Sequence, residues 1–281
     1  MPSETVDAAL RAATARLEAC SPSPRIDAEL LFLHALSWPR SRLFTNARTA
    51  LGDTQQASID ALIGRRLSGE PVAYITGTRG FWTLDLCVDK RVLIPRPETE
   101  LVVERALALY PDNQILTVAD LGTGSGAIAL ALASERPRWT ITATDQSVDA
   151  LAVARENAQR LGLTVTWEHG AWFRPLAGQR FDLIVSNPPY VAEGDVHLNQ
   201  GDVRFEPGSA LAAGPDGLDD LRRIIDAAPA HLQPHGWLIL EHGHDQAEAV
   251  ADILRKRGFA NIAGYRDLGG QPRVTEARTR P

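Results

Sequence analysis

Cysteine is scarce in this 281-residue chain, and long apolar runs are missing. Its two cysteines, Cys20 and Cys87, lie far apart, which excludes a disulfide framework and a cysteine zinc motif and favours a reducing compartment. No run approaches the ~18 apolar residues of a membrane span. The N-terminal stretch MPSETVDAALRAATARLEA lacks the apolar core of a signal peptide and, unlike a transit peptide, carries acidic residues. We therefore expect a soluble cytoplasmic protein.

The chain also lacks an excess of basic residues, since 29 Lys and Arg face 35 Asp and Glu, for a formal net charge of −6. This balance argues against broad electrostatic attraction to nucleic acid or to an anionic membrane. The seven histidines are scattered; His242 and His244 come closest to a pair, and without a third ligand no metal site is expected. Hydrophobic residues, by contrast, make up 44% of the chain, which suffices for a sizeable core in one or two domains.

Residues 1–70 are predicted to form a helical domain. Apolar residues recur at helical spacing in ETVDAALRAATARLEA, IDAELLFLHALS and SIDALIGRRLSG, the last of which ends on a glycine stop signal. This segment has eight arginines and eight acidic residues, so its charges cancel. A helical bundle with balanced charge is better suited to binding a protein than to binding a phosphate backbone. The alternative is that the bundle only stabilises the neighbouring domain. Residues 71–93 alternate aromatic and β-branched residues around glycines, which predicts a β-hairpin linker.

Residues 94–281 are predicted to alternate between strands and helices. Strands are expected in ILTVADL, TITATD, LTVTWE, FDLIVS and GWLILEHG, with a final strand pair in AGYRDLGGQPRVTEAR. Helices are expected in PETELVVERALALY, SGAIALALASE, SVDALAVARENAQRLG, GLDDLRRIIDAAPAHL and DQAEAVADILRKRG, with Ser147 as an N-cap and Gly162 as a stop. This alternation predicts a doubly wound α/β sheet, whose ligands bind outside the carboxyl ends of the strands.

A glycine-rich turn follows the first of these strands and opens a helix; it consists of Gly122, Thr123, Gly124, Ser125 and Gly126. Glycines let the backbone turn tightly and approach a ligand, and a helix N-terminus offers free N–H groups. Asp145 ends the next strand, where a carboxylate can accept hydrogen bonds from both hydroxyls of a ribose. The pair therefore indicates a site for a nucleoside-containing cofactor.

Two alternatives to that cofactor site stay open at this point. A nicotinamide dehydrogenase would show the same glycines, but such sites place a pyrophosphate on the helix. No basic substrate constellation and no placed histidine for hydride transfer accompany the turn in this sequence. A purely structural tight turn with a capping aspartate is the other alternative.

The strand FDLIVS ends on Asn187, Pro188, Pro189 and Tyr190, and proline cannot continue a central strand because it has no N–H for the ladder. A residue before proline is pushed toward extended backbone, so the carbonyls here are expected to be rigid and free to face a ligand. The Asn187 amide both donates and accepts, and Tyr190 offers a flat aromatic face. Together they suit a planar NH₂ group: Asn187 oxygen and the Pro188 carbonyl each accept one N–H while Tyr190 stacks on the plane.

The glycine turn, Asp145 and the NPPY motif together resemble an S-adenosylmethionine-dependent amino-methyltransferase. NPPY is shared by adenine N6 and protein-glutamine N5 methyltransferases, and the rest of the chain distinguishes them. From about residue 70 onward the chain resembles the HemK/PrmC family, in EPVAYITGTRGFWTLDLCVDKRVLIPRPETELVVE, RFEPGSALAAGPDGLDDLRRII, GWLILEHG and DLGGQPRV. The resemblance implies a Rossmann-like methyltransferase domain over residues 94–281. It also implies methylation of the glutamine in the GGQ motif of class 1 peptide chain release factors, which the helical domain helps to hold.

The resemblance also assigns roles to individual residues. It implies that the glycine turn and Asp145 bind the methionine and ribose of the cofactor, that Trp172 lies beside the adenine, and that Asn187 borders both cofactor and substrate. The substrate amide is placed on the NPPY residues, with Asn187, Pro188 and Tyr190 as catalytic residues and Pro189 beside them. Arg96 and Glu98 are implied to border the cleft, and Glu206 to order the loop after NPPY.

One departure and two rival functions accompany this interpretation. The family often has an aspartate where this chain has Ala171, so an adenine contact from that position is in doubt. An adenine N6 methyltransferase could flip a base toward NPPY, but the chain lacks an evident basic recognition domain for phosphate contact. A non-catalytic binding module conflicts with the intact glycine turn, Asp145 and NPPY. No long exposed apolar face requires a partner, so a monomer is expected. The charge balance leads us to expect that it binds no nucleic acid.

Overall fold

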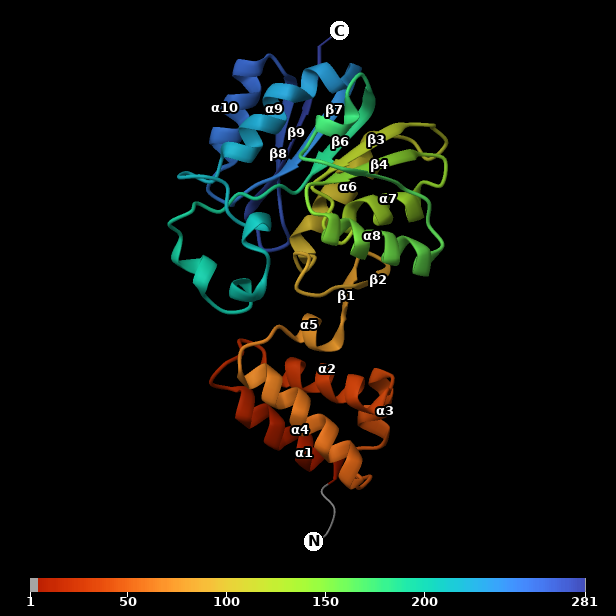
Figure 1. Ribbon diagram of the computed structural model, residues 1–281, viewed down its shortest axis with the longest axis vertical. Helices are drawn as coiled ribbons and strands as arrows, with labels where there is room; N and C mark the ends of the chain where they lie inside the picture. Colours follow the sequence, from red (N-terminus) through yellow and green to blue (C-terminus); the bar gives the residue numbers. More distant parts are fainter. Residues whose placement is uncertain (1–4, 281) are drawn as a thin grey trace. The chain divides into compact units, whose positions relative to one another are not determined.

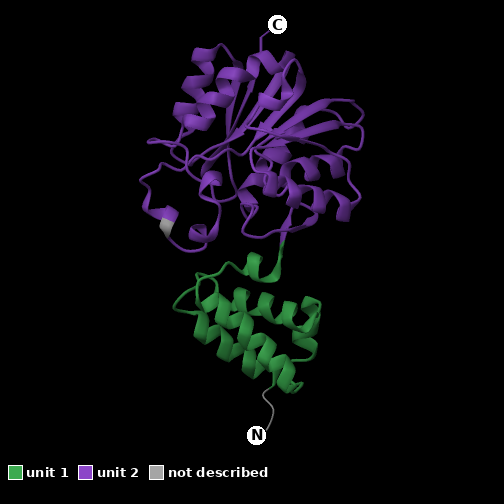
Figure 2. Cartoon of the chain, viewed as in Figure 1, with its two compact units in different colours: residues 1–78 green, residues 79–281 purple. Residues whose placement is uncertain are grey.

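The computed structural model describes residues 5–280, apart from the side chain of residue 199. The chain divides into two compact units, Met1–Thr78 and Arg79–Pro281, which are described separately (Figure 2). Within the described residues, every helix is too short or too polar to cross a lipid bilayer.

The first unit is helical, as predicted. It consists of α1 (Val6–Leu17), α2 (Pro24–Leu36), α3 (Arg40–Thr45), α4 (Asp53–Leu67) and α5 (Val72–Thr76). The Thr5 side chain caps α1 by accepting from Ala8 N, and Pro24 opens α2, where a missing N–H costs nothing. Buried apolar side chains from all five helices form one core, centred on Phe32, Leu31 and Ile63. The unit therefore has a core of its own.

The β-hairpin predicted over residues 71–93 is shorter than expected. Val72–Thr76 is the helix α5, which contributes Ile75 to the core of the first unit. Only β1 (Thr78–Phe81) and β2 (Leu84–Cys87) pair as a hairpin. The alternating pattern in 72–76 is too short to distinguish a strand from one helical turn. Packing of Ile75 against the other helices therefore decides its structure.

The second unit is the predicted doubly wound sheet. Its strands are β3 (Thr117–Leu121), β4 (Thr140–Asp145), β5 (Thr166–His169), β6 (Phe181–Ser186), β7 (Leu232–Glu241), β8 (Ala260–Arg266) and β9 (Pro272–Arg278). They lie in the order β5-β4-β3-β6-β7-β9-β8, and all pairs are parallel except those that β9 makes. The helices are α6 (Glu100–Leu109), α7 (Ala127–Glu135), α8 (Val148–Leu161), α9 (Asp219–His231) and α10 (Ala247–Arg257).

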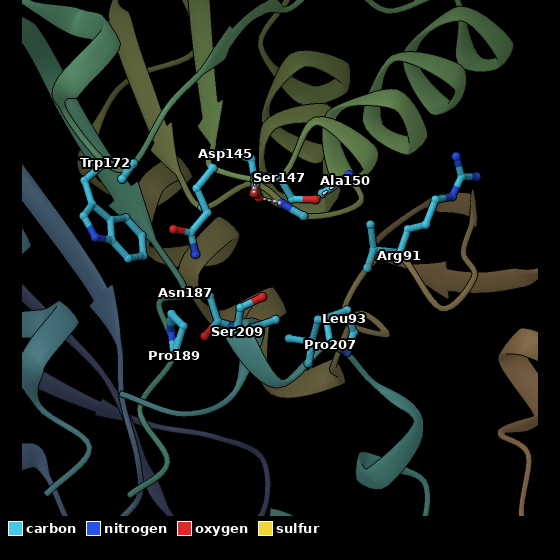
Figure 3. A pocket seen from close by; sticks show the side chains of 16 residues that line it. Arg91, Leu93, Asp145, Ser147, Ala150, Trp172, Asn187, Pro189, Pro207 and Ser209 are labelled. Atoms are coloured by element: carbon cyan, nitrogen blue, oxygen red, sulfur yellow. Dashed lines mark hydrogen bonds between the residues drawn. The ribbon is translucent and has the colours of Figure 1, made fainter. Parts of the chain in front are cut away.

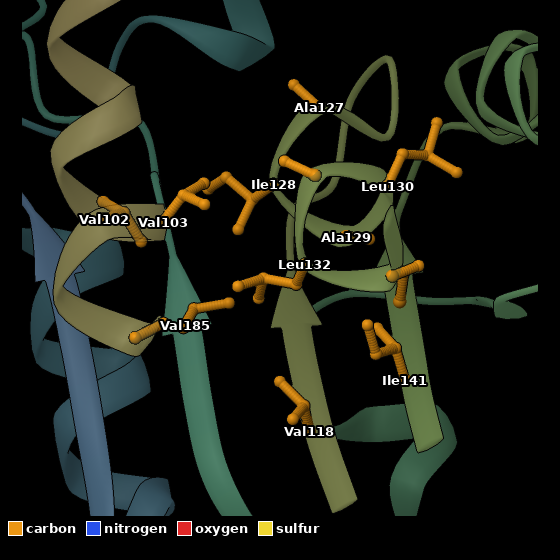
Figure 4. Close-up of a cluster of buried hydrophobic side chains, with 14 of the residues drawn as sticks. Val102, Val103, Val118, Ala127, Ile128, Ala129, Leu130, Leu132, Ile141 and Val185 are labelled. Atoms are coloured by element: carbon orange, nitrogen blue, oxygen red, sulfur yellow. The ribbon is translucent and has the colours of Figure 1, made fainter. Parts of the chain in front are cut away.

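Helices cover both faces of this sheet (Figure 1). Alternate strand residues face opposite layers, so Leu183 and Val185 pack with α6 and α7, whereas Ile184 packs with α9 and α10. Figure 4 shows Val185 and Val118 of the sheet beneath Val103 of α6 and the apolar side chains of α7. Burial on both faces explains why these strands are continuous apolar runs.

The predicted ends of α8 are confirmed. The Ser147 side chain accepts from Ala150 N at 3.1 Å, and Gly162 adopts the left-handed conformation that ends the helix. Short 3-10 turns were not predicted: η1 (Pro97–Thr99), η2 (Arg174–Leu176), η3 (Val196–Asn199), η4 (Val203–Phe205) and η5 (Gly208–Ala210). Three of them lie in the long segment between β6 and α9, beside the NPPY residues.

Candidate active site

The strand register brings one glycine and three polar side chains to one edge of the sheet. Leu121 of β3 is level with Thr144 of β4 and with Ser186 of β6, and Ser186 is level with Leu240 of β7. The next residue of each strand therefore lies in the same row, at the carboxyl edge, where doubly wound sheets bind ligands. That row consists of Gly122, Asp145, Asn187 and Glu241.

The glycine turn after β3 uses most of its own N–H groups. Gly122 N and Thr123 N both donate to Thr144 O, Gly124 N donates to Asp145 Oδ2, and Gly126 N donates to Thr123 O. Most N–H groups of the turn itself are therefore engaged, because the turn folds back on β4; free N–H groups at the start of α7 stay a prediction. A pyrophosphate would find few donors here, which disfavours the dinucleotide alternative.

Asp145 fixes the turn while keeping capacity to bind. Its two carboxylate oxygens accept from Gly124 N at 2.9 Å and from Ser147 N at 2.8 Å. Burial raises the pKa of Asp145, and these two backbone donors oppose that rise. Each carboxylate oxygen has a further lone pair that can accept a hydroxyl.

Asp120, two residues before Gly122, was missed by the sequence reasoning. It is fully buried, and its Oδ2 accepts from Thr123 Oγ1 at 2.6 Å and from Ala129 N at 3.2 Å. Burial raises its pKa to about 7. An acidic residue at the end of a buried strand, just before a glycine turn, was the available signal. Asp120 ties the turn to α7, which stabilises the turn from behind.

A cavity opens between the glycine turn and the NPPY residues. It encloses about 680 Å³, a volume that includes its open mouth. Among its lining residues are the predicted Gly122, Gly124, Asp145, Trp172 and Asn187. Figure 3 shows Trp172, Asp145 and Asn187 around one part of this cavity, with Arg91 and Leu93 across from them.

Trp172 lies at the cavity wall in an uncommon backbone conformation, with φ of 50°. Such a conformation in a bulky residue costs free energy and is frequent at binding sites. A Cβ added to Gly122 would lie 3.0 Å from Trp172 Cζ3, so the indole packs directly against that glycine. Ala171 also lines the cavity and brings no polar side-chain atom.

A second cavity lies on the other side of the NPPY residues. Its lining includes Pro188, Tyr190 and Arg96, and it shares Asn187 and Pro189 with the first cavity. Asn187 therefore faces both spaces. Glu98, predicted to border the cleft with Arg96, lines neither; it belongs to a separate pocket with Glu100 and Arg273.

The amide of Asn187 is oriented by a buried hydroxyl. Asn187 Nδ2 donates to Thr99 Oγ1 at 3.0 Å, and Thr99 is only 4% exposed. With its N–H group engaged, Asn187 keeps its side-chain oxygen available as an acceptor. The Tyr190 hydroxyl donates to Glu241 Oε1 at 3.2 Å, and burial raises the pKa of Tyr190. Thr99 and Glu241 were not singled out from the sequence.

Glu206 ties the segment after NPPY to the segment before α6. Its carboxylate is buried, accepts from Ile94 N at 3.1 Å and pairs with Arg96. This segment also forms a bridge between Val191 and Ala212. These contacts agree with the expectation that Glu206 orders the loop. They also place Pro207 and Ser209 in the wall of the first cavity, which the sequence reasoning missed.

Three predicted cofactor residues contribute backbone rather than a cavity surface. Thr123 and Ser125 have buried side chains, and neither lines the first cavity. The Ser125 carbonyl accepts from Asn157 Nδ2, and Gly126 packs closely, with Leu130, Trp167 and Ala154 within 3.3 Å of where its Cβ would be. Their part in cofactor binding stays a prediction.

Comparison with known proteins defines the class first. A family model described as "Methyltransferase small domain" matches residues 101–206. A solved methyltransferase from Pyrococcus furiosus shares the fold, with TM-score 0.55, 17% identity and coverage of 78% of this chain and 98% of that one. A T. thermophilus 16S rRNA methyltransferase, solved with AdoMet and guanosine, gives TM-score 0.53 at 19% identity, covering 72% and 50%. The chain is a Rossmann-like methyltransferase.

The particular family follows from curated relatives. A second family model, "PrmC N-terminal domain", matches residues 8–77. Proteins named release factor glutamine methyltransferase are 52% identical in Xylella fastidiosa, covering 96% of this chain and 97% of the relative, and 55% in Pseudomonas aeruginosa, covering 91% and 92%. The relative of that name in Escherichia coli is 48% identical, covering 96% and 97%. The chain belongs to the release factor glutamine methyltransferase family, which confirms the resemblance seen in the sequence.

Proposed function

We propose that this protein transfers a methyl group from S-adenosylmethionine to the side-chain amide nitrogen of the glutamine in the GGQ motif of class 1 release factors. The observation that carries the proposal is the pair of adjoining cavities that share Asn187 and Pro189. Cofactor in one cavity and glutamine in the other would meet at the Asn187 amide. Family membership names the acceptor, because the relatives are glutamine methyltransferases of release factors.

The first cavity fits S-adenosylmethionine. Gly122 and Gly124 lack a Cβ at its wall, Asp145 can accept from the ribose hydroxyls, and the Trp172 indole can lie along the adenine. Since four of the five N–H groups in the turn are engaged, the turn suits a cationic methionine moiety better than a phosphate. Ala171 offers no side-chain acceptor to the adenine amino group, so Trp172 carries more of the recognition. The cofactor supplies an electrophilic methyl group on a sulfonium.

The second cavity would hold the glutamine amide. Asn187 oxygen accepts one N–H, the Pro188 carbonyl accepts the other, and the Tyr190 ring lies over the amide plane. An amide nitrogen is a poor nucleophile because its lone pair is delocalised. Hydrogen bonds to both of its hydrogens favour a pyramidal nitrogen whose lone pair is aimed toward the first cavity. Positioning of this kind removes several kcal/mol, roughly, from a barrier when the reacting atoms are about 3–3.5 Å apart.

The bonds formed and broken balance without another reagent. A nitrogen–carbon bond forms as a carbon–sulfur bond breaks, so the sulfonium charge is neutralised and a neutral thioether leaves. The methylated nitrogen then loses one proton, which passes by way of the Asn187 or Pro188 oxygen to water. No metal or side-chain base is needed for these steps.

The helical first unit would help to hold the release factor. Its matching family model and its balanced charge agree with a surface that docks a protein rather than a phosphate backbone. An adenine N6 methyltransferase would use the same NPPY geometry on a flipped base, but neither the charge balance nor the relatives favour it. We propose a cytoplasmic monomer that binds no nucleic acid.

A methyl-transfer assay tests the function. Purified protein and methyl-labelled S-adenosylmethionine are incubated with a class 1 release factor, with the same factor carrying Gln→Ala in its GGQ motif, and with double-stranded DNA. We expect label on the intact factor alone. Label on DNA would establish the adenine alternative. Label on the Gln→Ala factor would show that a residue other than the GGQ glutamine is methylated.

A further inference from the structure

We propose that Glu241 is a positioning residue for methyl transfer, which fixes both Tyr190 and Asn187 from behind. The inference rests on the proposed function, because it assumes that these two residues hold the acceptor amide. Glu241 is the last residue of β7 and lies in the same row as Asn187. It is 0% exposed, so it acts through its neighbours rather than on the substrate.

The burial of Glu241 has no evident structural purpose. Within the described residues its carboxylate forms no ion pair, and its Oε2 has no hydrogen-bond partner. Burying a carboxylate without an ion pair costs free energy. Glu276 on the neighbouring strand provides the contrast: it is 4% exposed, but it pairs with Arg105 and accepts from the Tyr265 hydroxyl. Glu241 is buried without such an ion pair, which costs more free energy, and it lies next to the candidate site. This combination indicates a role in that site.

Two arms connect Glu241 to the amide-holding residues. Along the first, the Tyr190 hydroxyl donates to Glu241 Oε1 at 3.2 Å, which fixes the plane of the ring. Along the second, the Thr99 hydroxyl favours the charged form of the Glu241 carboxyl. Asn187 Nδ2 donates to that hydroxyl at 3.0 Å, and a negative charge on Glu241 favours the orientation of the hydroxyl in which its lone pairs face Asn187. The charged carboxylate thereby leaves the Asn187 oxygen turned toward the acceptor.

The charges around Glu241 make this arrangement sensitive to pH near neutrality. Burial and Glu98 of η1 disfavour the charged form, whereas Thr99, Tyr190 and Arg273 of β9 favour it. Together they raise the pKa of Glu241 to about 7. Protonation gives a donor to a carboxyl that now only accepts, and it weakens the hydrogen bond from the Tyr190 hydroxyl, because a neutral acceptor holds a donor less strongly than a charged one. Methylation should therefore slow as the pH falls through about 7.

The same pKa predicts the effect on stability. Because its folded-state pKa lies above its ordinary value of 4.5, Glu241 binds a proton more tightly in the folded protein. Ionisation therefore costs stability, and the cost grows between about pH 4.5 and pH 7 and is complete above that window. Glu241→Gln removes the cost while preserving shape. We expect this variant to have a melting temperature equal to or above that of the wild type at about pH 8.

The experiment compares wild type with Glu241→Gln on a release factor over about pH 6–9. We expect kcat to fall at least about tenfold at the upper end, with the S-adenosylmethionine Kd within about threefold of wild type. The acid limb of the kcat profile near pH 7 should be present in wild type and absent in the variant. Glu276→Gln is the matched buried control: it should lower the melting temperature and leave the profile unchanged.

Thr99→Val separates the two arms, since valine keeps the shape of threonine without its hydroxyl. If both arms end on Glu241, the loss of kcat in the double variant Thr99→Val with Glu241→Gln should be clearly smaller than the product of the single losses. Wild-type kcat in Glu241→Gln, an unchanged acid limb, or multiplicative losses would each overturn the inference. Wild-type protein that fails to methylate the release factor would instead overturn the proposed function.

Discussion

The two cavities are built from different parts of the polypeptide. At the ends of β3 and β4 the wall is mainly backbone: glycines without a Cβ, and a turn whose N–H groups are bound to Thr144 and Asp145. At the ends of β6 and β7 the wall is made of side chains, in which Asn187 donates to Thr99, Tyr190 donates to Glu241, and Thr99 favours the charged form of Glu241. The first is fixed by local geometry, the second by partners distant in sequence.

This difference separates binding from reactivity. A wall that is mainly backbone gives shape and affinity, and Asp145 is the group through which its binding would depend on pH. A network anchored on one buried carboxylate gives orientation, and it changes with protonation. The variants that follow test this separation, from the largest expected effect to the smallest.

The largest effect is expected for Asn187→Ala. Removal of the acceptor that orients the amide should lower kcat by about 100- to 1,000-fold, in line with the loss of one preorganised hydrogen-bonding group. Because Asn187 only borders the cofactor cavity, the S-adenosylmethionine Kd should change less than about tenfold. Single-turnover kinetics and calorimetry measure the two. Asn113→Ala, in an exposed loop, is the control, and near-normal turnover in Asn187→Ala would remove Asn187 from the mechanism.

Asp145→Ala should act on the other cavity. Loss of a charged acceptor for the ribose, and of the contact with Gly124 N, is expected to raise the S-adenosylmethionine Kd by about 10- to 100-fold. Binding of the release factor, measured without cofactor, should hardly change. Asp149→Ala, exposed in the first turn of α8, is the matched control. Equal losses of both affinities would contradict the division between the two cavities.

Two glycines of one turn separate packing from binding. Gly126 and Gly124 both have positive φ, but a Cβ at Gly126 would lie 3.0 Å from Leu130 Cδ1, whereas nothing lies within 4 Å at Gly124. Gly126→Ala should lower the free energy of unfolding by about 2–3 kcal/mol, and Gly124→Ala by about 1 kcal/mol. Urea unfolding measures both. Only Gly124→Ala, at the cavity wall, should weaken the cofactor affinity of the folded protein beyond its effect on stability.

The smallest effect is expected for Tyr190→Phe. The ring is kept and only the arm to Glu241 is lost, so kcat should fall by about three- to tenfold. Because the Tyr190 hydroxyl lowers the pKa of Glu241, its loss should move the acid limb of the kcat profile to higher pH. An acid limb that stays in place would show that Glu241 does not control the profile. Tyr265→Phe, which loses a bond to Glu276 instead, is the control.

The sequence alone predicted the backbone-built half of the site better than the side-chain network. A glycine turn after a strand and an acid after the next strand are local patterns, and the parallel register makes their proximity nearly inevitable. NPPY was also identified locally. Thr99 and Glu241 were missed because only the tertiary structure brings them to the site. Glu241 lies there because β6 and β7 are neighbours, and Thr99 because η1 lies against Asn187. The strand-like pattern of residues 72–76 misled for a related reason, since tertiary packing outweighed a short local preference.

The pairing of β3 with β6 divides the site into two parts of the chain, and this division has an evolutionary consequence. These strands are neighbours in the sheet, with Ser186 Oγ donating to Leu121 O at 2.6 Å, although β4 and β5 lie between them in the sequence. Most residues that line the cofactor cavity precede β6 in the sequence, whereas the NPPY residues and Glu241 follow β6 or end the next strand. A lineage of such enzymes could therefore acquire a new methyl acceptor by altering one continuous segment, residues 187–241. Most of the cofactor cavity would be inherited unchanged, because only Asn187, Pro189, Pro207, Ser209 and Ala210 of its lining lie in that segment.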